Sequence, residues 1–242
     1  VKRIKDNSVD LIVFSPPFSS LFTYSNYIHD MGNNDNHEEF FKQYHFLLQD
    51  LYRILKPGRL MVCHTKDLAV YKNSSGYTGL YNFTKDHDNA VENVGFKYHS
   101  KVNIWTDPVL EMQRTKTQRL LYKQLRKDST YTGVGLPEYC TVYRKWEGNE
   151  EDWTPVNNKN HENFPLDIWQ QWASPTWNVE REDIDHMEEV MKDYKVATWM
   201  DIRRTDVLNN SEGTDIGDEK HIAPLQLSVI KRAVQMWSNP GE

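Results

Sequence analysis

The residues with the clearest chemistry in this chain are Ser15, Pro16, Pro17 and Phe18, which directly follow an unbroken apolar run at residues 11–14. Such a run is typical of a central parallel strand. The two prolines lack backbone N–H groups, so they end the strand ladder and stiffen its carboxyl end. Ligands of open α/β sheets bind just beyond the carboxyl ends of strands. The motif therefore presents a hydroxyl group, rigid carbonyl groups and an aromatic ring where a substrate would bind.

This combination suits methyl transfer to an exocyclic amino group of a nucleobase. The lone pair of that amino group is delocalised into the ring, which makes the group a poor nucleophile. The Ser15 hydroxyl and the Pro16 carbonyl can each accept one N–H bond and direct the lone pair toward an electrophilic methyl group. The Phe18 ring can stack on the base, a contact worth about 1–3 kcal/mol, once the base has left the duplex. The alternative is a proline-terminated strand that leads into an ordinary loop.

Composition and charge bound the class of protein. A chain of 242 residues fits one large domain, or a domain with an inserted lobe. Eight Trp and thirteen Tyr are many for a chain that is only 38% hydrophobic, which indicates aromatic binding surfaces as well as core. The net charge of −6 argues against a uniformly basic nucleic-acid binder but allows a local basic patch.

The cysteines and histidines indicate neither a disulfide framework nor a metal centre. Cys63 and Cys140 lack C-x-x-C spacing, so we expect two reduced core thiols in a cytoplasmic protein. The nine histidines form no H-E-x-x-H motif and no Cys/His cluster, so no metal site is expected. No signal peptide is evident, and no apolar run approaches the roughly 18 residues of a membrane span.

The first half of the chain predicts a strand, a helix and a second strand. Apolar side chains in residues 38–55 recur at three- and four-residue steps and form one helical stripe. Pro57 and Gly58 are expected to end this helix, and residues 60–63 predict another buried strand. This order indicates a right-handed parallel crossover. We therefore expect residues 11–14 and 60–63 to form neighbouring strands.

Further along the chain, the pattern predicts a hairpin and then becomes irregular. Residues 82–93 predict a helix that ends near Gly95, and residues 96–105 and 139–143 predict two strands that can pair. Residues 146–200 lose this regularity and predict a linker and a small irregular lobe.

The end of the chain predicts two helices and a loop. Residues 183–194 favour a short helix, and residues 209–218 a polar loop. Pro224 is expected to open a final amphipathic helix, because proline is well placed in a first turn.

A basic tract lies in the connection between the two hairpin strands. It contains no acidic residue and comprises Arg114, Lys116, Arg119, Lys123, Arg126 and Lys127. A solvated helix face explains such a tract taken alone. Near a site for nucleobases, contact with DNA phosphates becomes the competing explanation.

Three separated segments resemble the β-class DNA amino-methyltransferases. These segments are residues 7–18 with the Ser15-Pro16-Pro17-Phe18 motif, Leu55-Lys56-Pro57-Gly58-Arg59, and Lys220-His221-Ile222-Ala223-Pro224-Leu225. Residues 24–26, 30–32 and 112–116 look like a phage- and mobile-element-associated branch, in which restriction–modification is a common setting. The resemblance covers nearly the whole chain in the permuted order of this class.

The resemblance implies a fold and a reaction. The fold would be α/β, a Rossmann-like S-adenosylmethionine-dependent methyltransferase fold with a mostly parallel sheet and an antiparallel hairpin. The reaction would move a methyl group from S-adenosylmethionine to an exocyclic amino group of a flipped base in double-stranded DNA. Serine with phenylalanine in the motif favours cytosine N4. The alternatives are adenine N6, or a non-catalytic nucleic-acid-binding module that kept the fold.

The resemblance also implies roles for individual residues. Ser15, Pro16, Pro17 and Phe18 match the catalytic motif. The segment that lines the cofactor site is matched by Lys220, His221, Pro224 and Leu225, with Ser15 adjoining it.

One feature of the class is missing. No glycine-rich cofactor loop follows the final helix, so we expect a fragment that is incomplete at its carboxyl end. We expect residues 1–145 to form the catalytic half, residues 146–200 a target-recognition lobe, and residues 201–242 a cofactor-side segment.

Overall fold

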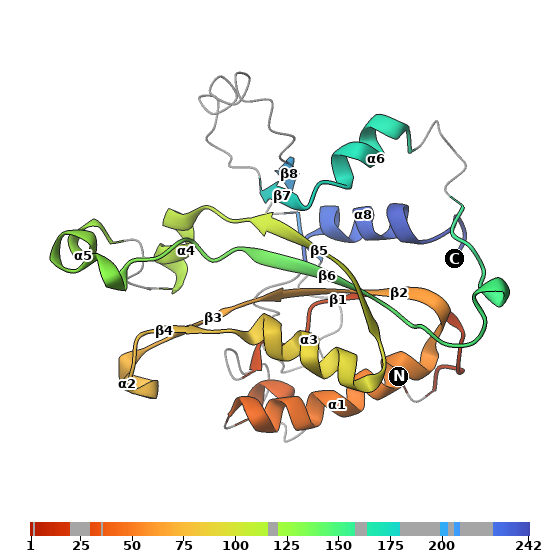
Figure 1. Cartoon of the computed structure of the whole chain (residues 1–242), viewed down its shortest axis with the longest axis horizontal. Helices are drawn as coiled ribbons and strands as arrows, with labels where there is room; N and C mark the ends of the chain where they lie inside the picture. Colours follow the sequence, from red (N-terminus) through yellow and green to blue (C-terminus); the bar gives the residue numbers. More distant parts are fainter. Residues whose placement is uncertain are drawn as a thin grey trace.

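The structure of the protein is a computed structural model, shown in Figure 1. It describes residues 1, 3–19, 30–34, 36–115, 121–157, 164–179, 199–202, 206–208 and 225–242. The strands are β1 (Val9–Phe14), β2 (Leu55–Lys66), β3 (Leu68–Val70), β4 (Gly79–Tyr81), β5 (Lys97–Trp105), β6 (Glu138–Arg144), β7 (Thr176–Val179) and β8 (Trp199–Ile202). The α-helices are α1 (His37–Ile54), α2 (Lys72–Ser75), α3 (Phe83–Val94), α4 (Pro108–Thr115), α5 (Tyr122–Lys127), α6 (Leu166–Trp172) and α8 (Leu227–Trp237). Short 3-10 helices lie at Met31–Asn33, Ser129–Tyr131 and Glu150–Asp152.

A six-stranded mixed sheet in the order β1-β2-β6-β5-β7-β8 organises the described residues. Strand β6 runs antiparallel to β2 and β5, and the other neighbouring strands pair in parallel. Strands β3 and β4 form a separate two-stranded sheet. The expected α/β fold, mostly parallel with one antiparallel hairpin, is confirmed.

The expected crossover between the first two strands is present. Leu11 pairs with Leu60, and Phe14 pairs with Cys63, in a parallel register. Helix α1 joins the two strands, and the Asn36 side chain caps it by accepting a hydrogen bond from the Glu39 amide. The prediction of neighbouring parallel strands is thus confirmed.

Strand β2 is longer than the sequence predicts. The helix ends at Ile54, and β2 starts at the next residue, so Pro57 and Gly58 lie inside the strand rather than in a separating turn. Gly58 has a φ of +77°, and a Cβ atom there would lie 2.4 Å from the Trp153 ring. Only glycine therefore fits this irregular point, where the pairing of β1 with β2 also shifts register.

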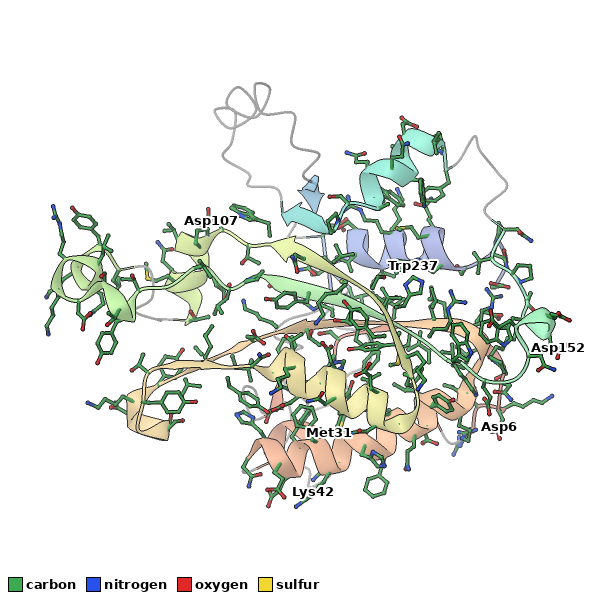
Figure 2. All side chains as sticks on the ribbon, in the orientation of Figure 1. Asp6, Met31, Lys42, Asp107, Asp152 and Trp237 are labelled. Carbon is green, nitrogen blue, oxygen red and sulfur yellow. The ribbon has the colours of Figure 1, made fainter. Side chains whose placement is uncertain are left out.

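Helices cover both faces of the sheet (Figure 1). Helices α1 and α3 cover one face, and their core includes Phe40, Leu48 and Phe83, each fully buried. Helices α6 and α8 lie over the other face, where Trp172 and Val229 pack against β6 residues. Figure 2 shows Trp237 at the end of α8, where it packs against this second core.

Residues 146–200 hold more regular structure than expected. Helix α6 and strands β7 and β8 arise there, and β7 extends the main sheet by pairing with β5. The expected short helix at 183–194 and the polar loop at 209–218 lie outside the described residues. The division into three segments stays a prediction.

The final helix agrees with its prediction except in its start. Helix α8 begins at Leu227 with Gln226 as its N-cap, and Pro224 lies outside the described residues. No helix in the described part of the chain has the length and apolar character that crossing a bilayer requires.

A polar network is buried beneath α1 and α3. The Tyr44 hydroxyl lies 3.0 Å from His87 Nε2, and His87 Nδ1 lies 3.2 Å from the Tyr143 hydroxyl. Tyr143 donates to Asp88, which pairs with Lys101 at 2.6 Å. Burial lowers the pKa of His87, because the apolar surroundings disfavour its cation. Burial also opposes ionisation of Asp88, but hydrogen bonds from His87, Lys101 and Tyr143 outweigh it and lower the pKa of this carboxyl.

His87 should make the stability of the fold dependent on pH. Its folded-state pKa lies below its ordinary value of about 6.5, so in mildly acidic solution the unfolded chain binds a proton that the folded chain does not. The contribution of His87 to the free energy of unfolding should therefore be retained above about pH 6.5. As the pH drops under 6.5, this contribution should decrease by up to about 1.4 kcal/mol per pH unit. Urea unfolding of the wild type and His87→Gln at pH 8 and 5.5 measures this effect.

Burial also lowers the pKa values of His37 and His99, so these residues add to the pH dependence of both proteins. The difference in the free energy of unfolding between wild type and His87→Gln removes their contribution and isolates that of His87. The His87→Gln protein should be less stable than the wild type at pH 8, and this gap should narrow at pH 5.5. An equal gap at both pH values would contradict the assignment.

Candidate active site

The motif expected to be catalytic, at residues 15–18, lies where β1 ends. Phe14 is the last residue of β1 and pairs with Cys63, so the next residues, Ser15 and His64, lie side by side. Ser15 Oγ is 3.3 Å from His64 Nδ1 and 3.2 Å from the His64 carbonyl oxygen. The parallel pairing of the two strands therefore holds the Ser15 hydroxyl against the imidazole.

His64 is held from its other side by a carboxylate. His64 Nε2 lies 3.0 Å from Glu138 Oε2, and both side chains are largely buried. Glu138 is the first residue of β6, which brings it to the edge where β2 ends. An ionised carboxylate only accepts hydrogen bonds, so this contact places the imidazole proton on Nε2. Nδ1 can then accept the one hydroxyl hydrogen of Ser15, for which the His64 carbonyl oxygen is the competing acceptor.

Two further charged side chains extend this cluster. Lys66 pairs with Glu138 in the strand register, and its Nζ lies 3.9 Å from Glu138 Oε1. Lys66 also forms an ion pair with Glu111 on α4, whose side chain is 3% exposed. We call Ser15, His64, Glu138, Lys66 and Glu111 the relay cluster. Its members come from the end of β1, from β2, from β6 and from α4, and in the order given each contacts the next.

Phe18 lies beside the relay cluster. Its ring centroid is 6.5 Å from that of His64 and 5.7 Å from that of Phe83, which it meets edge-on. The ring is partly buried and packs on the core beneath α1 and α3. The motif thus brings a hydroxyl group and an aromatic ring to one place, and stacking of Phe18 on a base stays a prediction.

The residue after Phe18 is anchored in a strained conformation. Ser19 is fully buried and has a φ of +54°, which is uncommon for a residue other than glycine. Ser19 Oγ lies 2.8 Å from His37 Nδ1, and the His37 ring stacks on Tyr81 with the centroids 3.8 Å apart. Tyr81 donates in turn to Asp86 at 2.6 Å. These contacts fix the downstream end of the motif to α1 and β4.

The described residues include one of the expected cofactor contacts at the start of α8. Leu225 is buried in the core that contains β1 residues Leu11 and Val13. Lys220, His221 and Pro224 lie outside the described residues. Near Leu225, Gln226 Oε1 and Ser228 Oγ are buried, and neither has a hydrogen-bond partner in the described part of the chain. Helix α8 begins on the side where β1 and β2 end (Figure 1).

The basic tract is only partly described. Arg114 lies in the last turn of α4, and Lys116 and Arg119 are outside the described residues. Lys123, Arg126 and Lys127 are exposed on α5. The tract lies in the connection from β5 to β6, and the described contacts do not join it to Ser15.

Sequence reasoning missed four members of the relay cluster. His64 and Lys66 alternate at the carboxyl end of β2, and Glu138 begins β6. Polar residues at alternate positions of a strand end were the available signal. Their contacts depend on the register of two strands that are far apart in the sequence, since Lys66 pairs with Glu138. The sequence does not reveal that register.

The described residues contain no group of three or more His, Cys, Asp or Glu side chains placed to hold a metal ion.

Comparison of the chain with known protein families identifies the class of protein to which this fold and site belong. A family model described as DNA methylase matches residues 9–242, so the chain belongs to the N6/N4 DNA methylase family. No curated protein matches the chain by sequence.

Two solved structures share the fold. The PvuII DNA methyltransferase, specific for cytosine N4, is 13% identical with a TM-score of 0.55, and the match covers 100% of this chain and 67% of that one. A putative DNA modification methylase of Thermus thermophilus, in complex with S-adenosyl-L-methionine, is 18% identical with a TM-score of 0.53 and coverages of 98% and 70%. The resemblance to DNA amino-methyltransferases is confirmed at the level of family and fold.

Lys66 should be important for stability, because it is the cation between two buried carboxylates. Lys66→Met would remove the ion pair of Glu111 and the Lys66 contact of Glu138, which keeps His64, and should lower the free energy of unfolding by about 3 kcal/mol. The matched control is Lys42→Met, because Lys42 projects from α1 into solvent (Figure 2) and pairs with exposed Glu38. Urea unfolding should show a large shift of the midpoint for the first variant and almost none for the second. Equal midpoints would mean that Lys66 is not the stabilising cation.

Proposed function

We propose that this chain is the catalytic part of a DNA methyltransferase that modifies an exocyclic amino group of a flipped base, with cytosine N4 as the target. The observation that carries this proposal is the Ser15 hydroxyl, held 3.3 Å from His64 Nδ1 at the carboxyl end of β1. Family membership supports DNA as the substrate. The serine and phenylalanine of the motif, together with the fold of the cytosine-N4-specific PvuII enzyme, support the choice of base.

Substrate positioning falls to the residues of the motif. The Pro16 carbonyl and Ser15 Oγ each accept one N–H bond of the target amino group, which turns its lone pair out of conjugation with the ring. Phe18 stacks on the extruded base. Pro16 and Pro17 restrict the backbone before Phe18, and the contact of Ser19 with His37 restricts it after Phe18. The motif therefore loses little conformational freedom when the base binds.

S-adenosylmethionine supplies the electrophilic methyl group when it is bound. Leu225 at the start of α8 would contact it, and the unpartnered oxygens of Gln226 and Ser228 suit its polar amino-acid end. Helix α8 packs against β1, the strand that Ser15 follows, which supports a cofactor site shared by Ser15 and this segment.

The relay cluster provides a route for the released proton. Methyl transfer would form a C–N bond as the S–CH₃ bond of the methyl donor breaks and a neutral thioether leaves, and one proton too many would remain on the amino nitrogen. Ser15 Oγ takes this proton as it passes its own hydrogen to His64 Nδ1, and Glu138 stabilises the resulting imidazolium. Lys66 and Glu111 hold Glu138 in place. General acid–base catalysis of this kind contributes about 10²–10⁴-fold to a rate.

Two observations bear on where in the cell, and in which system, the reaction takes place. Cys63 and Cys140 are buried free thiols, which supports a reducing, cytoplasmic location. A place in a restriction–modification system of a phage or mobile element rests on the sequence resemblance alone.

The decisive experiment measures methyl transfer and identifies the product. The protein is incubated with labelled S-adenosylmethionine and duplex DNA of diverse sequence, and the nucleosides are analysed by mass spectrometry. We expect N4-methylcytosine. N6-methyladenine alone would keep the reaction and overturn the choice of base. Binding of DNA without any methylated product would favour the non-catalytic module.

Ser15→Ala should lower the single-turnover rate by about 10²-fold and leave DNA affinity nearly unchanged, because orientation and proton transfer matter most in the transition state. Ser74→Ala on α2 is the matched control, since this exposed serine has its hydrogen bonds with Tyr71 and Ser75 and is no part of the relay cluster. Once Ser15 is absent, His64→Ala should cost little more, because the two residues act as a unit. Additive losses for the two variants would contradict the proton route.

The exposed cations of α5 should contact DNA phosphates. Lys123→Ala and Lys127→Ala should each weaken binding to all duplexes and reduce the slope of log Kd against log salt by about 1. Lys72→Ala, on exposed α2, is the control and should leave that slope unchanged. If the α5 variants keep the wild-type slope, the tract is a solvated face.

A further inference from the structure

The connection from β5 to β6 forms an arm at the catalytic edge of the sheet. Strands β2 and β5 both run antiparallel to β6, so β5 ends and β6 begins at the edge where β2 ends. The described parts of the arm include α4, α5 and the 3-10 helix at Ser129–Tyr131. Figure 1 shows α5 at the far left, beyond the ends of both strands. Glu111 fastens the base of the arm to Lys66 of the relay cluster.

The tip of this arm exposes large apolar side chains. Leu121, Tyr122 and Leu125 are 38%, 67% and 49% exposed. Tyr122 and Leu125 are three residues apart on α5, which places them on one side of the helix, and Leu121 is the N-cap residue directly before it. Single exposed apolar residues are ordinary on a protein surface, but two on one side of a six-residue helix, with a third at its N-cap, gather apolar surface in one place. We call these three residues the α5 patch.

Positive charge surrounds the α5 patch. Lys123, Arg126 and Lys127 lie on the same helix, and residues 121–127 contain no acidic residue, although the whole chain has a net charge of −6. The Arg126 guanidinium lies 5.4 Å from the centre of the Tyr122 ring, and its Nε donates to the Tyr122 hydroxyl at 2.9 Å. Asp128, the next residue, has its carboxylate occupied by the amide and hydroxyl of Thr130.

A polyanion with an apolar interior matches this combination. Phosphates would lie against the three cations, and stacked bases would accept the apolar side chains. Proteins that deform duplex DNA insert side chains such as leucine between base steps, and flanking arginine and lysine residues hold the backbone. A protein partner would be expected to meet the apolar side chains without so dense a ring of cations.

We propose that the α5 patch is a DNA wedge, in which Tyr122 and Leu125 insert at a base step while Lys123, Arg126 and Lys127 hold the phosphates on either side. The inference rests on the proposed function and deepens it, because it adds an apolar contact with bases to the phosphate contact of the basic tract. Unstacking a step would also lower the cost of extruding a nearby base.

The apolar and ionic contacts have different salt signatures. Phosphate contacts release counterions, so their loss changes the slope of log Kd against log salt. Insertion of Leu125 releases no counterions, so its loss should weaken binding at every salt concentration and leave the slope unchanged. This difference separates the wedge from the phosphate contacts on the same helix.

The experiment measures binding of the whole chain to end-labelled duplexes over a range of salt concentrations. Tyr122→Ala and Leu125→Ala together should weaken binding by about tenfold with an unchanged slope. Leu125→Gln, which keeps the size of the side chain and removes its apolar character, should also weaken binding. The control is Val134→Ala, because Val134 is 78% exposed on the same arm but outside α5. Circular dichroism melting verifies that each variant is folded.

A second readout tests insertion directly. In a set of duplexes, 2-aminopurine replaces adenine at successive positions, and its fluorescence rises where stacking is lost. The wild type should raise the fluorescence at one step or more, and the Leu125→Ala protein should not.

Each outcome has a definite meaning. Wild-type affinity and fluorescence in the α5 variants would overturn the wedge and leave the proposed function standing. A wild type that binds no duplex would overturn the proposed function and the wedge together. Sedimentation supplies the remaining outcome, because a wild-type oligomer that dissociates in the Leu125 variants would overturn the wedge and assign the patch to contact between two copies of this chain.

Discussion

The parallel pairing of β1 with β2 is the constraint on which the candidate site depends. Backbone hydrogen bonds between the two strands set Phe14 opposite Cys63, and this register alone decides that the next residue of each strand is a serine and a histidine in contact. A slip of one residue would turn His64 to the other face of the sheet. Helix α1 protects the register, because its buried stripe and capped start fix the length of the crossover.

The antiparallel strand β6 completes the constraint. It is the only strand that runs against its neighbours among the described residues of the main sheet, and this direction brings the start of β6 to the edge where β2 ends. Glu138 therefore reaches His64 from a distant part of the sequence. The arrangement buries two carboxylates and partly buries a lysine, which costs desolvation energy that a purely apolar packing would avoid. Such a cost is typical of functional sites, where orientation of a reacting group outweighs stability.

The parts of the fold that sequence predicts are those set by local periodicity. The buried run of β1, the stripe of α1 and the end of α3 at Gly95 are all written in short segments. Strands β7 and β8 have four residues each, too few for a period, and their pairing is set by distant neighbours. Pro57 and Gly58 mislead for a related reason, because Trp153 fills the space beside Gly58 and the chain passes through the irregularity as a strand. The candidate catalytic motif could be recognised in the sequence, whereas the side chains that contact it could be found only from the register of the sheet.

The burial of both cysteines makes the native protein a blank background for thiol chemistry. Cys63 and Cys140 are the only cysteines in the chain, and both are inaccessible. Burial also raises the pKa of each thiol, which further suppresses the reactive thiolate. A single cysteine introduced on the surface would therefore take up a maleimide dye or a crosslinker at one known place, without prior removal of the natural thiols. The distances from that place to a labelled nucleic acid could then be measured on the otherwise unaltered chain.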